Sequence, residues 1–200
     1  MMVFEVIQII ALVLMSVVLH EYAHGWVAHR LGDDTAKSAG RLTLNPFAHI
    51  DLVGSVLVPF ILWQLGTFIF GWARPVPVNF GKLNNPKRDM IWLAAAGPAA
   101  NVFLATIGVG LLHLQLAGAA AVVIFKGIWI NLFLAVFNLI PVPPLDGGRI
   151  LTGILPDAAM PFMRRIEPFG ILIVIVLLNL GLFDVLDVVV YRLAAFFGLH

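Results

Sequence analysis

Three ionisable side chains close together in an apolar part of the chain give the first indication of chemistry. His20 and His24 are four residues apart, so on a helix both imidazoles lie on one face and can bind a single cation. Glu21 lies beside them, where its carboxylate can act as a general base on a water at that cation. Two histidines that merely hydrogen-bond to neighbours are the weaker interpretation, because ionisable groups inside a membrane helix are costly unless paired or functional. The motif therefore predicts a metal site with Glu21 as the catalytic residue.

A third metal ligand must come from elsewhere, because a catalytic zinc normally has three protein ligands and one open position. Asp146 is the candidate at the edge of another apolar run. Three prolines before it force the chain out of a helix, and two glycines after it allow a turn. Such an irregular segment is tolerated in a membrane only where protein buries it or a wet cavity adjoins it. We therefore predict Asp146 as the third ligand, with a solvent-facing turn aspartate as the alternative.

Three asparagines in apolar runs are further candidates. Asn101 follows a stretch of small residues suited to close helix contact and could line the site. Asn131 and Asn138 are seven residues apart, so they share a helix face that leads toward Asp146. Hydrogen bonding between helices is an equally good interpretation of such amides. We take Asn138 and Asn101 as the predicted substrate-binding residues.

The composition places these residues in a membrane protein. Of 200 residues 61% are hydrophobic and only 12% are charged, with a mean hydropathy of +1.01, which is far from the composition of a soluble domain. A net charge of +1 provides no basic surface for nucleic acid. The absence of cysteine excludes disulfides, thiolate metal sites and a cysteine nucleophile.

The apolar runs predict how often the chain crosses the membrane. Five runs approach the roughly 20 residues that a crossing needs, at 3–29, 52–72, 90–115, 117–140 and 169–190. If all five cross, Lys and Arg divide almost evenly between the two sides and predict no orientation. If 52–72, which contains Pro59, is re-entrant or interfacial, all basic residues except Lys126 and Arg192 share one side. We prefer this four-crossing topology, with both termini outside and the metal site toward the cytoplasm.

Two polar stretches have the alternation typical of strands. Residues 40–44 and 73–78 alternate apolar with polar or proline residues, which predicts a small β-strand element near the cytoplasmic face. Its edge could dock another extended backbone. The predicted fold is therefore an all-α multi-pass protein of the cell membrane, with about four to six transmembrane helices, one of them re-entrant. Residues 1–200 form one intramembrane domain in this prediction.

The order of these motifs resembles the site-2 protease family of intramembrane zinc metalloproteases. The likeness rests on His20–His24 with Glu21, on Gly97 to Asn101, and on Asn138 through Asp146 and its glycines. It is strongest to compact prokaryotic members, and the chain has no room for a PDZ or CBS domain. The resemblance implies that His20, His24 and Asp146 bind zinc, that Glu21 is the catalytic acid and base, and that Asn138 helps to hold substrate. It also implies cleavage of membrane-spanning segments of other proteins in regulated intramembrane proteolysis.

Two other functions stay open from the sequence. One is a membrane-embedded metal hydrolase that acts on a lipid or other non-protein substrate. The other is a catalytically silent membrane-binding protein or transporter that uses the polar residues for ions or packing. Two histidines and a carboxylate can also hold iron or cobalt, and the sequence leaves open whether the protein forms a homo-oligomer.

Overall fold

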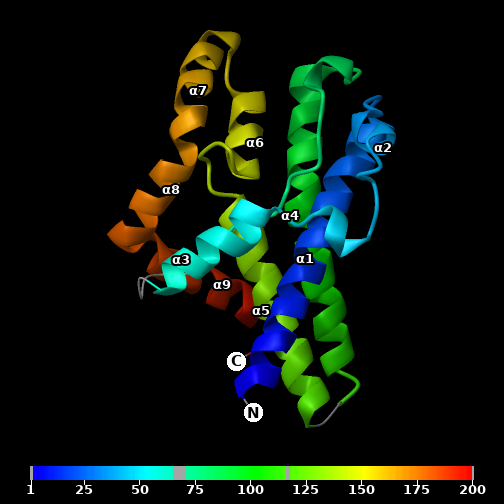
Figure 1. Ribbon diagram of the computed structural model, residues 1–200, viewed down its shortest axis with the longest axis vertical. Helices are drawn as coiled ribbons and strands as arrows, with labels where there is room; N and C mark the ends of the chain where they lie inside the picture. Colours follow the sequence, from blue (N-terminus) through cyan, green and yellow to red (C-terminus); the bar gives the residue numbers. More distant parts are fainter. Residues whose placement is uncertain (1, 65–70, 116–117, 200) are drawn as a thin grey trace.

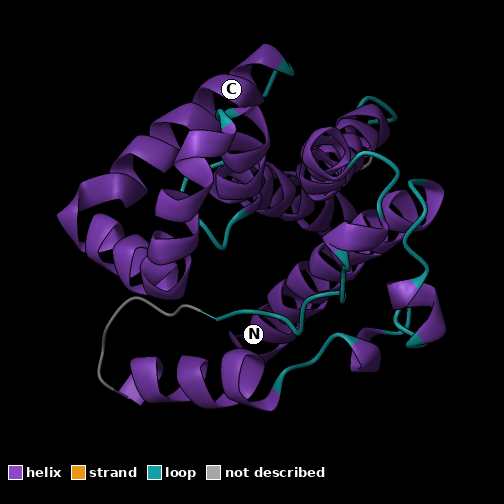
Figure 2. Cartoon of the chain, turned by 90° about the horizontal axis from the view of Figure 1, so that it is seen from above, coloured by secondary structure: helices purple, strands orange, loops and turns teal. Residues whose placement is uncertain are grey.

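The computed structural model describes residues 2–64, 71–115 and 118–199, and these form helices joined by loops (Figures 1 and 2). The α-helices are α1 (Met2–Arg30), α2 (Thr35–Ser38), α3 (Val58–Gln64), α4 (Pro86–Leu112), α5 (Ala119–Asn138), α6 (Asp146–Ile154), α7 (Met160–Ile166), α8 (Gly170–Leu177) and α9 (Phe183–Phe196). Short 3-10 helices are η1 (Pro46–Ala48), η3 (Phe80–Lys82), η4 (Asp157–Ala159) and η5 (Glu167–Phe169), and π-helical turns are η2 (Leu52–Leu57) and η6 (Leu178–Leu182).

Among the described residues, 4 helical stretches are long and apolar enough to cross a membrane. They are Phe4–Arg30, Pro86–Leu112, Ala119–Asn138 and Asp157–Phe196. Helix α4 begins with proline at its first position, where the missing N–H removes no helical hydrogen bond. The predicted all-α, multi-pass architecture is confirmed.

Helices α1, α4 and α5 lie side by side along the long axis and contact one another (Figure 1). The two termini lie at one end of the molecule, and α2, α7 and the start of α4 lie at the other. This arrangement brings the middle of α1 against the first half of α4, and it brings the end of α5 close to both.

The fourth stretch bends instead of running straight. Gly181 has φ of 94°, a left-handed conformation that glycine adopts without steric cost, and the chain turns there between α8 and α9. Helix α9 returns to pack on α5, where Val190 and Ala194 join the core made by Ala105, Val109, Ile128 and Leu132 of α4 and α5. The bend therefore lets α9 return to the core formed by α4 and α5.

The run predicted as re-entrant or interfacial forms the short apolar helical stretch Leu52–Gln64. Asp51 caps it, because its carboxylate accepts the N–H of Gly54 at 2.7 Å. At 1.5 Å per residue the stretch extends about 20 Å, less than the roughly 30 Å of hydrocarbon. The described part of this run is thus too short to cross, and residues 65–70 of the predicted run lie outside the described residues.

The predicted β-strand element is wrong: neither 40–44 nor 73–78 forms a strand, and no strand occurs in the described ranges. Pro75 and Pro77 have no N–H to donate to a ladder. The remaining backbone groups bind single residues instead, since the N–H of Arg74 donates to the carbonyl of His49 at 2.9 Å and the Arg41 guanidinium donates to the carbonyl of Arg74 at 2.8 Å. Alternation in the sequence could not reveal that these bonds replace strand pairing.

Candidate metal centre

The two histidines of the motif lie next to each other inside the protein. His20 and His24 are one helical step of four residues apart on α1 and are 6% and 5% exposed. Their Nε2 atoms are 3.0 Å apart. The helix spacing predicted from the sequence therefore delivers both rings to one buried point.

Asp146 meets these rings from another part of the chain. It is the first residue of α6, it is 5% exposed, and its Oδ2 lies 3.1 Å from Nε2 of His20 and 3.2 Å from Nε2 of His24. The two following glycines permit this approach: a Cβ on Gly147 would lie 2.2 Å from the carbonyl oxygen of Leu139, and one on Gly148 would lie 2.3 Å from a loop backbone nitrogen. Any larger residue would push α6 away from the end of α5.

Hydrogen bonds on the far side of each ring determine which nitrogen carries a proton. Nδ1 of His20 lies 2.6 Å from Oδ1 of Asn101, and Nδ1 of His24 lies 2.7 Å from the carbonyl oxygen of Leu93. Both oxygens only accept, so each Nδ1 is the donor, and in its neutral form each ring presents the lone pair of Nε2 to Asp146. Two Nε2 lone pairs and a carboxylate oxygen that has no hydrogen-bond partner thus converge on one point.

Such a group of buried acceptors fits a divalent cation. Zinc bonds of about 2.0–2.2 Å to nitrogen and oxygen place tetrahedral ligand atoms about 3.3–3.6 Å apart. The three observed separations of 3.0, 3.1 and 3.2 Å need only a small expansion to meet that value. His20, His24 and Asp146 are the group of possible metal ligands that the described residues contain.

Gly97 of α4 makes room for the rings. A Cβ at Gly97 would lie 2.4 Å from Nε2 of His24 and 2.5 Å from Cε1 and Nε2 of His20. Only glycine allows the α4 backbone to lie this close to both imidazoles. The sequence signal was the small-residue stretch before Asn101, which indicates close helix contact but not its partner.

Glu21 lies at the edge of a cavity of about 100 Å³ that opens onto the cluster. Its Oε2 accepts the backbone N–H of Val76 at 2.8 Å. Arg149 also lines this cavity. Sequence reasoning missed Val76, whose contribution is a backbone N–H, and Arg149, for which no spacing signal exists.

The two predicted substrate-binding asparagines lie in different environments. Asn138 lines the cavity, and its Nδ2 donates to the carbonyl of Leu134 at 2.9 Å. Asn101 is fully buried, accepts from His20 and donates to Oδ1 of Asn131 at 2.9 Å. This placement favours a role for Asn101 in orienting His20, while substrate binding by Asn138 stays a prediction.

Asp33 holds the loop that covers the site. Its carboxylate accepts the N–H of Asn79 at 2.6 Å and both the N–H and the hydroxyl of Thr35. Burial acts to raise the pKa of Asp33, but the hydrogen bonds from Thr35 and Asn79 outweigh it and lower that pKa below its ordinary value. Asp33 is thus a structural residue that ties the end of α1 to the segment at 72–79.

Comparison with known proteins agrees with this centre. The model of peptidase family M50 matches residues 112–181. The putative zinc metalloprotease YwhC of Bacillus subtilis is 41% identical over 174 residues, which cover 82% of this chain and 76% of YwhC. The putative zinc metalloprotease Rip2 of Mycolicibacterium smegmatis is 34% identical over 177 residues, which cover 86% of this chain and 66% of Rip2. No solved structure matches the chain.

The family resemblance drawn from the motifs is therefore confirmed by similarity along most of the chain. Helices long enough to span a membrane and a buried acceptor cluster agree with it. The chain belongs to peptidase family M50, the site-2 protease family of membrane metalloproteases.

Proposed function

We propose that this protein hydrolyses peptide bonds within or near transmembrane segments of other membrane proteins. The observation that carries the proposal is the convergence of His20, His24 and Asp146 as three buried acceptors beside the carboxylate of Glu21. Zinc is the metal proposed for this cluster, because the relatives are named zinc metalloproteases and the ligand separations suit it.

The chain's own residues account for the remaining steps. Zinc, when bound, supplies Lewis-acid chemistry that acidifies a water and polarises the scissile carbonyl. Glu21 would take a proton from the attacking water and later pass it to the leaving amine. The N–H of Val76 holds one oxygen of Glu21 and so directs the carboxylate along the cavity. Asn101 keeps Nε2 of His20 available as a ligand by accepting from Nδ1.

The depth of the site favours a membrane-embedded substrate. His20 lies within the apolar stretch Phe4–Arg30, about 24 Å from its first residue and about 15 Å from its last at 1.5 Å per residue, so the cluster lies between the two ends of a helix that is long enough to span a membrane. A transmembrane helix hides its carbonyls in its own hydrogen bonds and must unwind locally before one can be attacked. The cavity beside the cluster, which protein lines, can accept such an unwound stretch.

The test compares cleavage with metal content in purified protein reconstituted in lipid. We expect the wild type to bind one zinc and to cleave a transmembrane peptide. Glu21→Gln should keep the zinc and lose activity by about 10²- to 10⁴-fold, because only the proton transfer is removed. Glu5→Gln, on the same helix and exposed, should behave as the wild type.

Each alternative function has its own outcome in this test. Zinc binding with hydrolysis of a lipid ester and no peptide cleavage would support the non-protein hydrolase instead. Zinc binding with no hydrolysis of either substrate would support the catalytically silent protein. Retained peptide cleavage in Glu21→Gln would refute Glu21 as the base.

The orientation of the site is a further part of the proposal. The end of the molecule that carries α2 and the start of α4 is rich in Lys and Arg, which accumulate on the cytoplasmic side of membrane proteins (Figure 1). We therefore place the opening of the active site toward the cytoplasm of a multi-pass protein in the cell membrane.

A further inference from the structure

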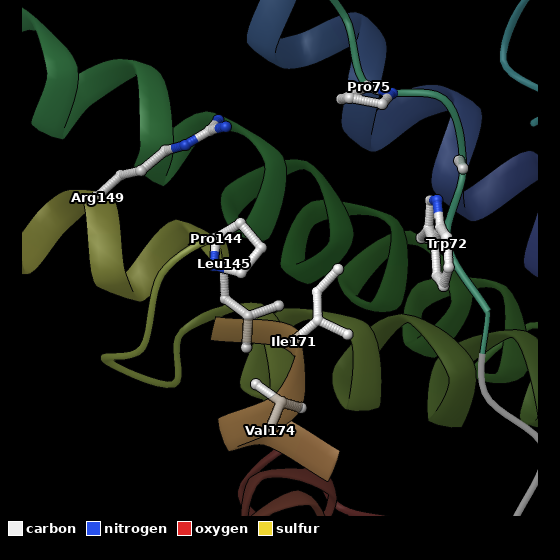
Figure 3. A pocket seen from close by; sticks show the side chains of 8 residues that line it. Trp72, Pro75, Pro144, Leu145, Arg149, Ile171 and Val174 are labelled. Atoms are coloured by element: carbon white, nitrogen blue, oxygen red, sulfur yellow. The ribbon is translucent and has the colours of Figure 1, made fainter. Parts of the chain in front are cut away.

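A second cavity adjoins the metal centre. It has a volume of about 300 Å³ and lies between the segment that carries Trp72 and the start of α8 (Figure 3). Pro75, Pro144, Leu145 and Arg149 line both this cavity and the smaller one at the cluster, so the two spaces are immediate neighbours. We call the larger space the Trp72 pocket.

The lining of the Trp72 pocket is apolar except at its inner end. Trp72 and Ala73 contribute one wall, and Ile171 and Val174 contribute the wall that faces them. Figure 3 shows Ile171 between Leu145 and Trp72, and Arg149 on the side of Leu145 that is away from Trp72. An apolar space of this size is at the small end of ligand pockets and suits a side chain better than a whole chain segment.

The wall at Trp72 is held in place by the helical stretch that starts at Leu52. The N–H of Trp72 donates to the carbonyl of Gly54 at 3.1 Å, and the hydroxyl of Ser55 donates to the carbonyl of Trp72 at 2.9 Å. A Cβ at Gly54 would lie 2.3 Å from Nε1 of Trp72, so the indole rests directly on the glycine backbone. This wall is therefore preformed.

The opposite wall is held by a second glycine contact. A Cβ at Gly170 would lie 1.6 Å from the carbonyl oxygen of Pro143 and 2.7 Å from a ring carbon of Pro144. This contact places the first turn of α8, with Ile171, directly against the loop that leads to Asp146. The pocket thus lies next to the predicted metal ligand Asp146.

The backbone beside the pocket has few donors to offer a substrate. The N–H groups of Arg74 and Val76 already donate to His49 and Glu21, and Pro75 and Pro77 have none. The predicted addition of a substrate strand along this segment therefore finds little to bind. Substrate recognition at this segment therefore depends on side chains.

We propose that the Trp72 pocket is a specificity pocket that binds one bulky apolar side chain of the substrate next to the scissile bond. This inference rests on the proposed function. Its occupant is a Leu-, Met- or Phe-sized side chain, which transmembrane segments supply in abundance and which an unwound stretch would otherwise leave without packing. Apolar pockets discriminate by about 10- to 200-fold per missing methylene, so an alanine at this substrate position should lower kcat/KM by at least about tenfold.

The experiment uses zinc-loaded protein in lipid and transmembrane peptides with Phe, Leu or Ala at successive positions around the cleaved bond. We expect one position at which Phe and Leu exceed Ala in kcat/KM. Val174→Phe fills the pocket and should reverse that preference, while Val176→Phe, exposed on the same helix, should leave it unchanged. Ala73→Leu narrows the pocket from the opposite wall and should have the same effect as Val174→Phe, which guards against misfolding of one variant.

The outcomes separate this inference from the proposed function. Cleavage without any preference for a bulky side chain, or an equal loss for all peptides in both filled variants, would overturn the Trp72 pocket assignment and leave the protease function in place. Absence of peptide cleavage by the zinc-loaded wild type would refute the proposed function and the pocket assignment together.

Discussion

Gly97→Ala should damage the metal centre although it adds a single methyl group outside the ligand set. The new Cβ would lie 2.4 Å from Nε2 of His24 and 2.5 Å from atoms of His20. Carbon–nitrogen contacts settle near 3.5 Å, so the rings or α4 must move apart by about 1 Å. The rings cannot turn away freely, because each Nδ1 is held by a hydrogen bond, one to Asn101 and one to the carbonyl of Leu93.

The cost divides between stability and function. Overpacking of this kind lowers the free energy of unfolding by about 1–3 kcal/mol. A displacement of about 1 Å at a catalytic centre lowers the rate by about 10²-fold. We therefore expect Gly97→Ala to bind zinc weakly and to cleave a transmembrane peptide about 100-fold more slowly, as measured by zinc titration and initial rates.

A matched control lies on the same helix. A Cβ at Gly110 would meet nothing within 4 Å, so Gly110→Ala should retain wild-type zinc content and activity. If Gly97→Ala bound zinc with unchanged affinity and cleaved within twofold of the wild-type rate, the close approach of α4 to the imidazoles would not control the site, and the reasoning would be refuted.

Three further predictions concern other parts of the chain. Asn101→Leu removes the acceptor for Nδ1 of His20 and should weaken zinc affinity by about 10- to 100-fold in a titration; an unchanged affinity would contradict the positioning role. The pKa of Asp33 is lower in the folded protein than in the unfolded chain, so its ionised carboxylate stabilises the fold above the unfolded pKa of about 3.9. This stabilisation is lost as the pH falls through the folded pKa. In urea unfolding, the free energy of unfolding of Asp33→Asn should therefore lack the loss that the wild type shows on acidification. The chain has no cysteine, so single variants Asn85→Cys and Ala119→Cys should react with an impermeant maleimide from the cytoplasm and from outside, respectively; the reverse pattern would invert the orientation.

Much of the centre could be predicted from local sequence. The four-residue step between His20 and His24 places both rings on one face of any helix, and α1 contains them as expected. The apolar runs predicted helices long enough to cross a membrane, because length and hydropathy are additive properties of a segment. Asp146 could be inferred because few other ionisable groups lie at the edge of an apolar run.

The predicted strands show where local pattern failed. Residues 73–78 alternate as a strand does, yet Arg41, His49 and Glu21 bind the backbone groups that would have paired. Those partners come from distant positions in the chain. Alternation specifies which side chains share a face, and it does not specify what the backbone will bond to.

The sequence by itself determined the membrane class, the two-histidine face of α1 and the residue types that can hold a cation. Only the tertiary structure decided that Asn101 supports His20, that Gly97 makes space for both rings and that Val76 holds Glu21. The physical reason is that helix periodicity and hydropathy act over a few neighbouring residues. The approach of backbone to side chain depends on how separate helices pack, and one Cβ in the wrong place would prevent it.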